Sequence, residues 1–254
     1  MKVTIITAAY NSEKTISACI ESVASQTYPR MEHIIIDGGS KDSTLSIIRQ
    51  YRSKIAYWVS EPDEGMYDAM NKGIQAATGD LVGILNSDDV YADNYVVEKV
   101  VETISDNNVD SCYGDLVYVD RINADKVIRY WKSGCFYRRK FRRGWMPPHP
   151  TFFVKKSIYE KYGSLNTDFP LAADYELMLR FLYKYEVSTA YIPEILIKMR
   201  TGGTSNPWSY TAKAVFENYR SWKINNLNPK LITFALKPLS KILQFRQVRN
   251  HIRS

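Results

Sequence analysis

The chain has 254 residues and a composition typical of a globular protein, with 45% hydrophobic and 24% charged residues. Its apolar runs fall short of the roughly 20 residues that a membrane-spanning helix needs. The opening MKVTIITAAY favours a buried strand over a secretory signal, and three widely spaced cysteines argue against a disulfide framework or a zinc knuckle. We therefore expect a protein of the reducing cytoplasm.

The net charge of +7 is concentrated at the C-terminal end of the chain. Residues 206–254 hold nine Lys or Arg against one acid, Glu217, so residues 1–205 are close to neutral. A basic appendage on a neutral body favours an anionic surface as partner. The basic run Arg138–Arg143 leaves a nucleic-acid-binding module as an alternative, but the neutral body argues against a nucleic-acid partner.

The first 90 residues alternate apolar runs with amphipathic segments. Apolar residues recur at helical spacing after Ile16 and after Leu45, and a third helix is expected over Tyr67–Ala77. The runs between these segments predict strands at Val3–Ile6, His33–Ile36, Ile55–Val59 and Leu81–Leu85. This order predicts an α/β fold with a mostly parallel central sheet and helices on both faces.

The second half of the chain has a looser pattern. We expect helices at Val96–Ile104, Ser157–Tyr162 and Ala172–Lys184, and strands at Ser111–Val119 and Val127–Trp131. In the basic tail, Asn206-Pro207 and Asn228-Pro229 each resemble an N-cap followed by proline in the first turn. They predict two tail helices.

Three of the predicted strands end in polar residues: Thr7–Asn11, Asp37–Ser40 and Asn86–Asp89. Parallel α/β sheets bind ligands beyond the carboxyl ends of their strands, so we expect these segments to converge on one edge. In the third segment the adjacent carboxylates of Asp88 and Asp89 repel each other unless a cation lies between them. Oxygen ligands suit Mg²⁺ or Mn²⁺, although an Asp at such a turn can also cap a helix.

Three segments together resemble family 2 glycosyltransferases of the GT-A fold: VTIITAAYN, IIIDGGSKDST and SEPDEGMYDAMNKGIQAATGDLVGILNSDD. The long segment is similar to bacterial enzymes that build exopolysaccharide or O-antigen repeat units. The resemblance covers residues 1–205. It implies a GT-A catalytic domain with a nucleotide-sugar-binding half (1–118) and an acceptor half (119–205), followed by a basic amphipathic helical tail (206–254).

The resemblance implies the donor-binding residues one by one. Thr7, Ala9 and Tyr10 would lie along the base and ribose, and Asp37 would accept a hydrogen bond from them or cap its own turn. Asp68 and Lys72 would face the donor or remain solvated helix residues.

The family's DXD motif falls on Asn86-Ser87-Asp88. Asn86 replaces the first acid, which leaves Asp88 and Asp89 as ligands for Mn²⁺ or Mg²⁺ and Asn86 and Asp88 as donor contacts. Arg200 would meet the pyrophosphate.

The acceptor side is implied by the segment Ala172–Leu177, which resembles the family's acidic motif at the start of a helix. The catalytic base falls on Asp174, and Ala173 stands where the family often has Glu. A carboxylate there could instead complement the helix dipole. His149 and Trp145 would lie on the acceptor or leaving-group side, and each could equally be structural.

The resemblance implies an inverting glycosyltransferase that moves a sugar from a metal-bound nucleotide diphosphate sugar, with a UDP-sugar expected, to an acceptor hydroxyl. We expect a lipid-linked saccharide acceptor in bacterial surface polysaccharide synthesis. The basic segment 229–254 would hold the enzyme on the anionic inner face of the cell membrane, or its apolar side would pack back on the catalytic body. The alternative enzyme, a nucleotidyltransferase, would show a glycine- and arginine-rich phosphate loop, which Thr7–Asn11 lacks.

Overall fold

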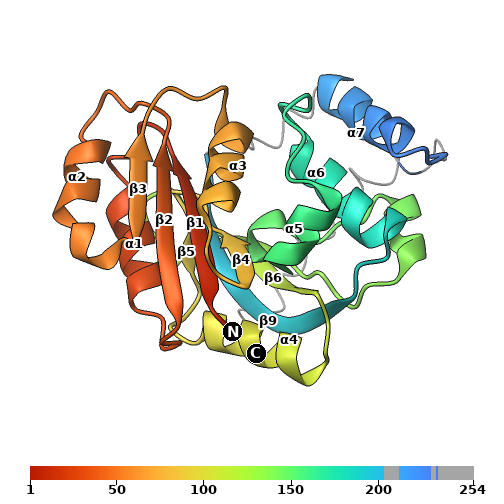
Figure 1. Ribbon diagram of the computed structural model, residues 1–254, viewed down its shortest axis with the longest axis horizontal. Helices are drawn as coiled ribbons and strands as arrows, with labels where there is room; N and C mark the ends of the chain where they lie inside the picture. Colours follow the sequence, from red (N-terminus) through yellow and green to blue (C-terminus); the bar gives the residue numbers. More distant parts are fainter. Residues whose placement is uncertain (203–211, 230–232, 234–254) are drawn as a thin grey trace.

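The structure, a computed structural model, describes residues 1–202, 212–229 and 233. In these residues one mixed sheet runs through the molecule, with strands in the order β3-β2-β1-β4-β8-β6-β9-β5 and β7 paired to β6 (Figure 1). The strands are β1 (Val3–Ala9), β2 (Met31–Asp37), β3 (Tyr57–Ser60), β4 (Leu81–Ile84), β5 (Val90–Tyr91), β6 (Ser111–Val119), β7 (Val127–Trp131), β8 (Phe153–Lys155) and β9 (Thr189–Arg200).

Seven α-helices accompany this sheet in the described part of the chain. They are α1 (Ile16–Ala24), α2 (Thr44–Gln50), α3 (Met66–Ala76), α4 (Val96–Asp106), α5 (Lys156–Tyr162), α6 (Ala173–Met178) and α7 (Ala212–Ile224). A π-helical segment, Leu179–Lys184, continues α6, so the single helix expected over Ala172–Lys184 changes its winding half-way. Short 3₁₀ turns lie at Arg52–Lys54, Arg138–Arg143 and His149–Thr151.

The α/β fold class is confirmed, and the parallel part of the sheet is its first half. β1 pairs in parallel with both β2 and β4, and β2 pairs in parallel with β3. Beyond β4 the sheet becomes mixed, because β8 is antiparallel to β4 and β6 while β9 is parallel to β6. One continuous sheet therefore joins the predicted donor half to the predicted acceptor half.

β9 has no counterpart among the strands expected from the sequence. Its run TAYIPEILIKMR is interrupted by Pro193 and Glu194, and proline inside an apolar run argues against a central strand. Pro193 and Glu194 lie at a shift in the pairing register between β6 and β9. Tyr113 pairs with Tyr191 and Asp115 pairs with Ile195, so β9 has extra residues at this point. The ladder resumes beyond the shift and carries Arg200 to the same end of the sheet as the first strands.

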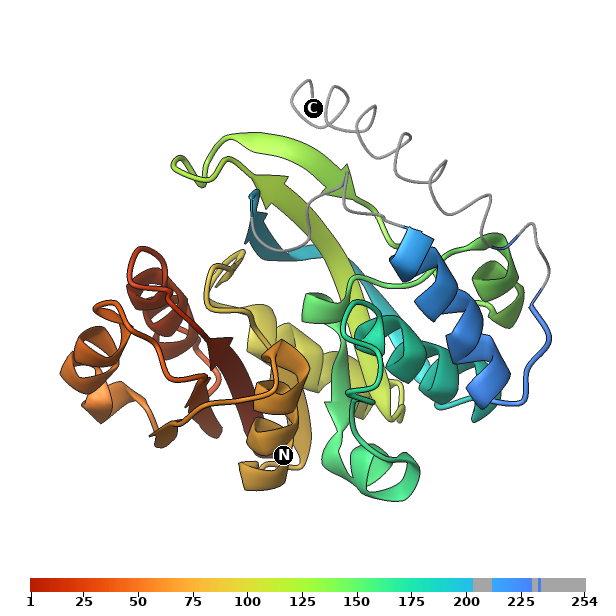
Figure 2. The ribbon, with the colours of Figure 1, turned by 90° about the horizontal axis from the view of Figure 1, so that it is seen from above.

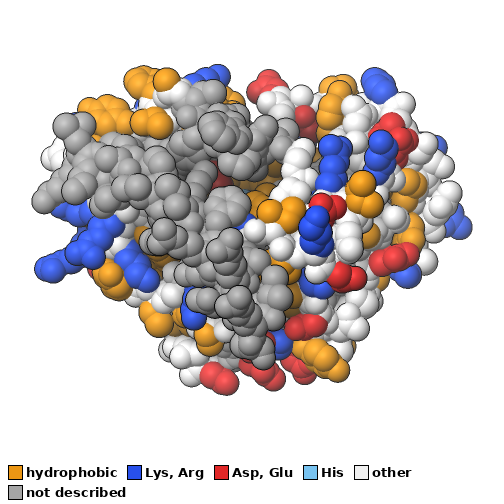
Figure 3. Space-filling view, turned by 180° about the vertical axis from the view of Figure 1, so that it is seen from behind, with side chains coloured by type: hydrophobic (Ala, Val, Ile, Leu, Met, Phe, Trp, Pro, Cys, Tyr) orange, Lys and Arg blue, Asp and Glu red, His pale blue; other side chains and the backbone are white. Residues whose placement is uncertain are grey.

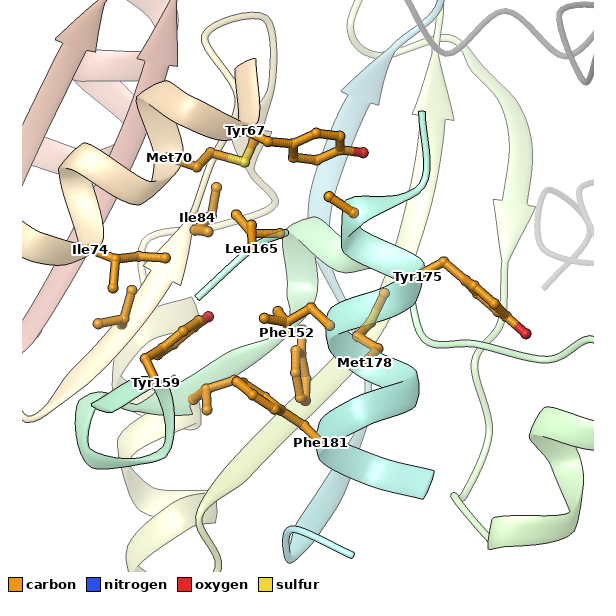
Figure 4. Packing of buried hydrophobic residues seen from close by; sticks show 14 of the residues in the cluster. Tyr67, Met70, Ile74, Ile84, Phe152, Tyr159, Leu165, Tyr175, Met178 and Phe181 are labelled. Carbon is orange, nitrogen blue, oxygen red and sulfur yellow. The ribbon is translucent and has the colours of Figure 1, made fainter. Parts of the chain in front are cut away.

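Helices cover both faces of the sheet, as the alternation of the strands requires. Ile6, Ile34 and Ile36 point to the face covered by α3, whereas Val3 and Ile5 point to the opposite face with α1 and α4. Figure 4 shows the first of these cores, in which Met70 of α3 faces residues of the acceptor half. No helix among the described residues is long and apolar enough to cross a bilayer.

Part of the predicted basic tail packs on the body. α7 runs beside α6 (Figure 2), and Trp222 of α7 is completely buried. The Trp222 indole Nε1 donates a 2.8 Å hydrogen bond to the Tyr175 hydroxyl. Residues 206–254 were expected to form one appendage, and within this range the structure describes 212–229 and 233, of which α7 is integrated into the core.

Trp222→Ala should therefore destabilise the body and not merely loosen an appendage. Loss of a large buried aromatic costs about 3–5 kcal/mol through lost burial and the cavity left behind. Urea unfolding would measure this change. Tyr219→Ala, on the exposed side of the same helix, is the matched control and should change stability by less than about 0.5 kcal/mol. Equal effects of the two variants would contradict the packing of α7.

Candidate active site

The three polar strand ends meet at one edge of the sheet, as expected. The Asn11 amide donates to Ser40 Oγ at 2.8 Å, and the Lys41 amide donates to Asn11 Oδ1 at 2.9 Å. The hydroxyls of Ser12 and Ser87 lie 2.7 Å apart, which ties the loop after β1 to the loop after β4. These bonds fix the relative positions of the segments that surround Asp88.

Asp88 and Asp89 differ in their surroundings although they are neighbours. Asp88 is half-buried, whereas Asp89 is fully buried. Asp89 Oδ2 accepts from Asn86 Nδ2 at 2.9 Å, and its Oδ1 accepts from the Arg200 amide at 3.3 Å. Burial, followed by the charge of Asp88, raises the pKa of Asp89 well above its ordinary value. Burial also raises the pKa of Asp88, and this increase is opposed by nearby Arg200 and Arg121.

Arginine side chains supply the positive charge around this carboxylate pair. Arg200 lies at the end of β9, beside Asp89, and its Nη1 is buried without a hydrogen-bond partner among the described residues. Arg121 follows β6, and its Nη1 would lie 3.6 Å from a Cβ added at Gly202. Arg121 was not predicted, because sequence gives no sign that the residues after β6 lie close to Asp88. Just beyond Arg200, residues 203–205 lie outside the described residues.

Of the three residues expected along the base and ribose, Tyr10 has an exposed side chain, and Thr7 and Ala9 have buried ones. Tyr10 is 62% exposed at the end of β1. Thr7 is fully buried, with its hydroxyl 3.0 Å from His33 Nε2, and Ala9 packs against α1 and α2. Only the backbone of Thr7 and Ala9 can therefore face a ligand at this edge without rearrangement.

The Asp37 carboxylate is fully buried and accepts hydrogen bonds from its own turn and from β3. Oδ2 accepts from the Ser40 amide at 2.9 Å and from Ser60 Oγ at 2.7 Å. This arrangement matches the turn-capping alternative. The carboxylate of Asp63, which was not predicted, lies against Gly38, since a Cβ added there would come within 2.4 Å of Asp63 Oδ2. Gly38 is therefore needed for the close approach of these two segments.

Asp68 and Lys72 form an ion pair across one turn of α3. Lys72 Nζ lies 3.3 Å from Asp68 Oδ2 and 2.8 Å from Glu61 Oε1. Both side chains of the Asp68–Lys72 pair are roughly a quarter exposed. They can therefore be reached by a ligand, but each already has a charged partner.

Asp174 lies in the first turn of α6 and is contacted by a residue of α3. The Tyr67 hydroxyl of α3 donates a 3.3 Å hydrogen bond to Asp174 Oδ1, and Figure 4 shows Tyr67 reaching from α3 towards the start of α6. Burial and then the charge of Asp174 raise the pKa of Tyr67 well above its ordinary value, so the phenol stays protonated. Tyr67 belongs to the segment YDAMN, but its reach to Asp174 could not be read from sequence.

His149 is buried close to Asp174. Burial lowers the pKa of His149 below its ordinary value, and the charge of Asp174 opposes that decrease. The imidazole is therefore neutral near neutral pH. Tyr118 of β6 connects this region to the carboxylate pair, since burial raises its pKa, Arg129 lowers it, and both Asp89 and Asp174 add to the increase. The negative charges of Asp89 and Asp174 thus both influence the pKa of Tyr118.

Trp145 lies in an aromatic cluster. Its ring packs at 5.7 Å from both Phe136 and Phe141, and its Nε1 donates to the Ser133 carbonyl at 2.8 Å. The side chain is half-buried, so this arrangement favours the structural alternative.

Comparison with known families decides the class of the protein. The model of glycosyl transferase family 2 matches residues 4–163, which is more than half of the chain. The chain belongs to glycosyl transferase family 2. This membership confirms the resemblance and the enzyme class, and it decides against the nucleotidyltransferase and nucleic-acid alternatives for the catalytic body.

Individual proteins of known sequence or structure agree with this family. An uncharacterised glycosyltransferase of Mycobacterium tuberculosis is 38% identical over 185 residues, which cover 70% of this chain and 68% of the relative. Staphylococcus aureus TarS 1–349 with UDP-GlcNAc has a TM-score of 0.66 at 18% identity, covering 95% of this chain and 72% of TarS 1–349. The mannosyltransferase PcManGT of Pyrobaculum calidifontis, with GDP-Man and Mn²⁺, has a TM-score of 0.67 at 17% identity, covering 94% and 68%.

These structures have the GT-A fold, so the predicted fold is confirmed. The match covers only 39% of a longer TarS structure, so this chain corresponds to part of that protein.

The carboxylate pair gives a pH-dependent prediction for metal binding. Because the pKa values of Asp88 and Asp89 are raised on folding, the folded protein holds these protons more tightly, and ionisation of the pair lowers stability as pH rises. A divalent cation should reverse this loss. The increase in Tm on adding Mn²⁺ should therefore be larger at about pH 7.5 than at about pH 5.

Asp88→Asn should abolish the Mn²⁺-induced increase in Tm and leave the Tm in EDTA unchanged or higher. Asp106→Asn, an exposed acid at the end of α4, is the matched control and should keep the full Mn²⁺ response. A Mn²⁺ response that survives Asp88→Asn would reject this carboxylate as a ligand.

Proposed function

We propose that the protein transfers a sugar, with inversion, from a metal-bound nucleoside diphosphate sugar to an acceptor hydroxyl. The observation that carries the proposal is the presence of two carboxylate sites held by contacts between the loops and helices around them. The Asp88–Asp89 pair follows β4, in the loop that the Ser87 hydroxyl ties to Ser12, and Asp174 Oδ1 accepts a 3.3 Å hydrogen bond from Tyr67 of α3. One site suits the leaving diphosphate, and the other suits removal of a proton from the acceptor.

On the donor side, Asp88 is the residue best suited to hold Mn²⁺ or Mg²⁺. It is half-buried, whereas both oxygens of the buried Asp89 already accept hydrogen bonds. No group of three His, Cys, Asp or Glu side chains suited to a metal occurs among the described residues, so diphosphate oxygens and water would complete the coordination. When bound, the ion supplies positive charge to the departing diphosphate.

The protein's own cations fit the same anion. Arg200 has a buried Nη1 without a partner among the described side chains, and an anionic diphosphate would satisfy it. Tyr10, exposed at the end of β1, would lie along the base. TarS in complex with UDP-GlcNAc has the same fold, which supports a UDP-sugar as donor.

On the acceptor side, Asp174 would receive the proton of the attacking hydroxyl. As that oxygen forms its bond to the anomeric carbon, the bond from this carbon to the diphosphate oxygen breaks and the nucleoside diphosphate leaves. A single displacement inverts the anomeric carbon and needs one carboxylate base. Tyr67 would orient this carboxylate, and the neutral His149 would contact the acceptor or the leaving group.

We further propose that the acceptor is a lipid-linked saccharide and that the enzyme works on the inner face of a bacterial cell membrane. The basic composition of residues 229–254 supports an electrostatic contact with anionic lipid. Of this segment, residues 229 and 233 alone are described.

The donor proposal is tested by a thermal-shift screen of nucleotide sugars with and without Mn²⁺. The true donor should stabilise the protein by about 2.7 kcal/mol at a hundredfold excess over its Kd, and this gain should fall when EDTA replaces Mn²⁺. A donor that stabilises equally in EDTA would contradict the metal assignment.

Asp174→Asn should lower kcat by roughly a hundredfold or more and leave the donor Kd within about twofold, because a base acts on the acceptor in the transition state. Asp168→Asn, an exposed acid on the preceding loop, is the matched control and should retain activity. Loss of donor binding by Asp174→Asn with kcat retained would instead make Asp174 a nucleotide-site residue.

A further inference from the structure

The helix α7 has an unusual distribution of polar and apolar side chains. Its buried side holds Glu217, Asn218 and Ser221 beside Ala214 and Trp222, and the buried Asn225 follows the helix directly. Its exposed side holds Val215, Phe216, Tyr219 and Ile224, which are 37%, 62%, 40% and 43% exposed. A surface helix normally buries its apolar side, so α7 is inverted.

Hydrogen bonds to α6 and to the residues just before it engage two of these polar side chains. Glu217 Oε2 accepts from the Leu171 amide at 2.9 Å, and Asn225 Nδ2 donates to Glu176 Oε1 at 2.9 Å. With the bond between Trp222 and Tyr175, these contacts hold α7 to residues on both sides of Asp174. These contacts account for much of the inner side of α7, where the buried Glu217 Oε1 has no hydrogen-bond partner among the described residues, but they give no reason for the apolar residues outside.

The exposed apolar side lies next to positive charge. Lys213, Arg220 and Lys223 are exposed on α7, where the sole acid, Glu217, faces inward. Arg220 lies 4.0 Å from Asp168, so one of these cations has an acidic neighbour. Leu171, 49% exposed and three residues before Asp174, extends the apolar surface towards the predicted base.

The basic segment Arg138–Arg143 adjoins this surface through Tyr183. The Tyr183 ring packs 4.9 Å from Trp222 of α7, and the Arg138 guanidinium lies 4.7 Å from the same ring. Arg139 and Arg143 are exposed. Figure 2 shows this segment beside α7, and Figure 3 shows hydrophobic side chains exposed at the end of the molecule where α7 lies.

We propose that the outer side of α7, together with Leu171 and the segment Arg138–Arg143, is a docking surface for an anionic lipid bilayer. Apolar side chains that enter the headgroup region, flanked by cations, are what such a surface requires, and nucleic acid would not need the exposed aliphatic residues. Because α7 is bonded to α6 around Asp174, docking holds Asp174 at a fixed position relative to the lipid surface. The link to a lipid-linked acceptor rests on the proposed function, whereas the docking itself does not.

Flotation of the full chain with vesicles tests the surface. Vesicles of phosphatidylcholine with phosphatidylglycerol should carry the protein, and vesicles of phosphatidylcholine alone should carry less. The apolar variant Phe216→Ser and the double variant Arg139→Glu/Arg143→Glu should each lower the vesicle-bound fraction by roughly fivefold. Matched controls beside the edge strand β3, Tyr57→Ser and Arg49→Glu/Lys54→Glu, should bind as the unmodified chain does.

Several outcomes would overturn the inference. If the unmodified chain does not float, the surface is not a bilayer site. If the chain floats and the α7 and Arg139/Arg143 variants float equally well, segment 229–254 alone carries the contact. If Phe216→Ser instead converts an oligomer to a monomer in light scattering, the outer side of α7 is an interface between copies.

The same variants separate this inference from the proposed function. Because all substituted residues are exposed, their Tm and their stabilisation by nucleotide sugar and Mn²⁺ should match those of the unmodified chain. Failure of the unmodified chain to bind any nucleotide sugar would reject the proposed donor but leave the flotation result valid.

Discussion

Two adjacent carboxylates at the end of β4 set the electrostatic constraint on which the site depends. Burial of Asp88 and Asp89 raises the pKa of both, and an amide from Asn86 and the backbone of Arg200 satisfy the inner one. Ionising two neighbouring carboxylates where water is scarce costs free energy. A divalent cation that binds between the carboxylates and a diphosphate would offset this cost. The surrounding loops, joined through Ser12 and Ser87, hold this arrangement before any donor arrives.

Sequence predicted the first four strands of the sheet and the meeting of their polar ends, because these signals are local. Apolar runs gave the four parallel strands, and their polar ends gave the converging loops. The orientation of single side chains at the strand ends was harder to predict. The side chains of Thr7 and Ala9 are buried, whereas that of Tyr10 is exposed. β9 was missed because Pro193 and Glu194 interrupt it, and a register shift that admits them is a tertiary event. Tyr67 could not be paired with Asp174 because 107 residues separate them.

Charge counting and packing describe the C-terminal region differently. The excess of Lys and Arg after residue 205 suggested a single appendage, because net charge reports on exposed side chains. Net charge gives no information about uncharged side chains such as Trp222 and Asn225, which are buried against the body. The inverted amphipathicity of α7 also shows why apolar periodicity can mislead, since a helix may use polar side chains for tertiary contacts and leave its apolar side outside.

The continuous sheet has a mechanical consequence. β4, β8 and β6 are hydrogen-bonded in succession, and the β4–β8–β6–β9 ladder spans both halves of the enzyme without an interdomain linker. Hinge closure between two lobes, which many transferases use to assemble a site, would have to break this ladder. The sheet therefore fixes the distance between the elements that carry the two carboxylate sites. Any adjustment to donors or acceptors of different size must come from the loops at its edge and from side chains such as Arg200, whereas the backbone spacing between the two carboxylate sites is set by folding.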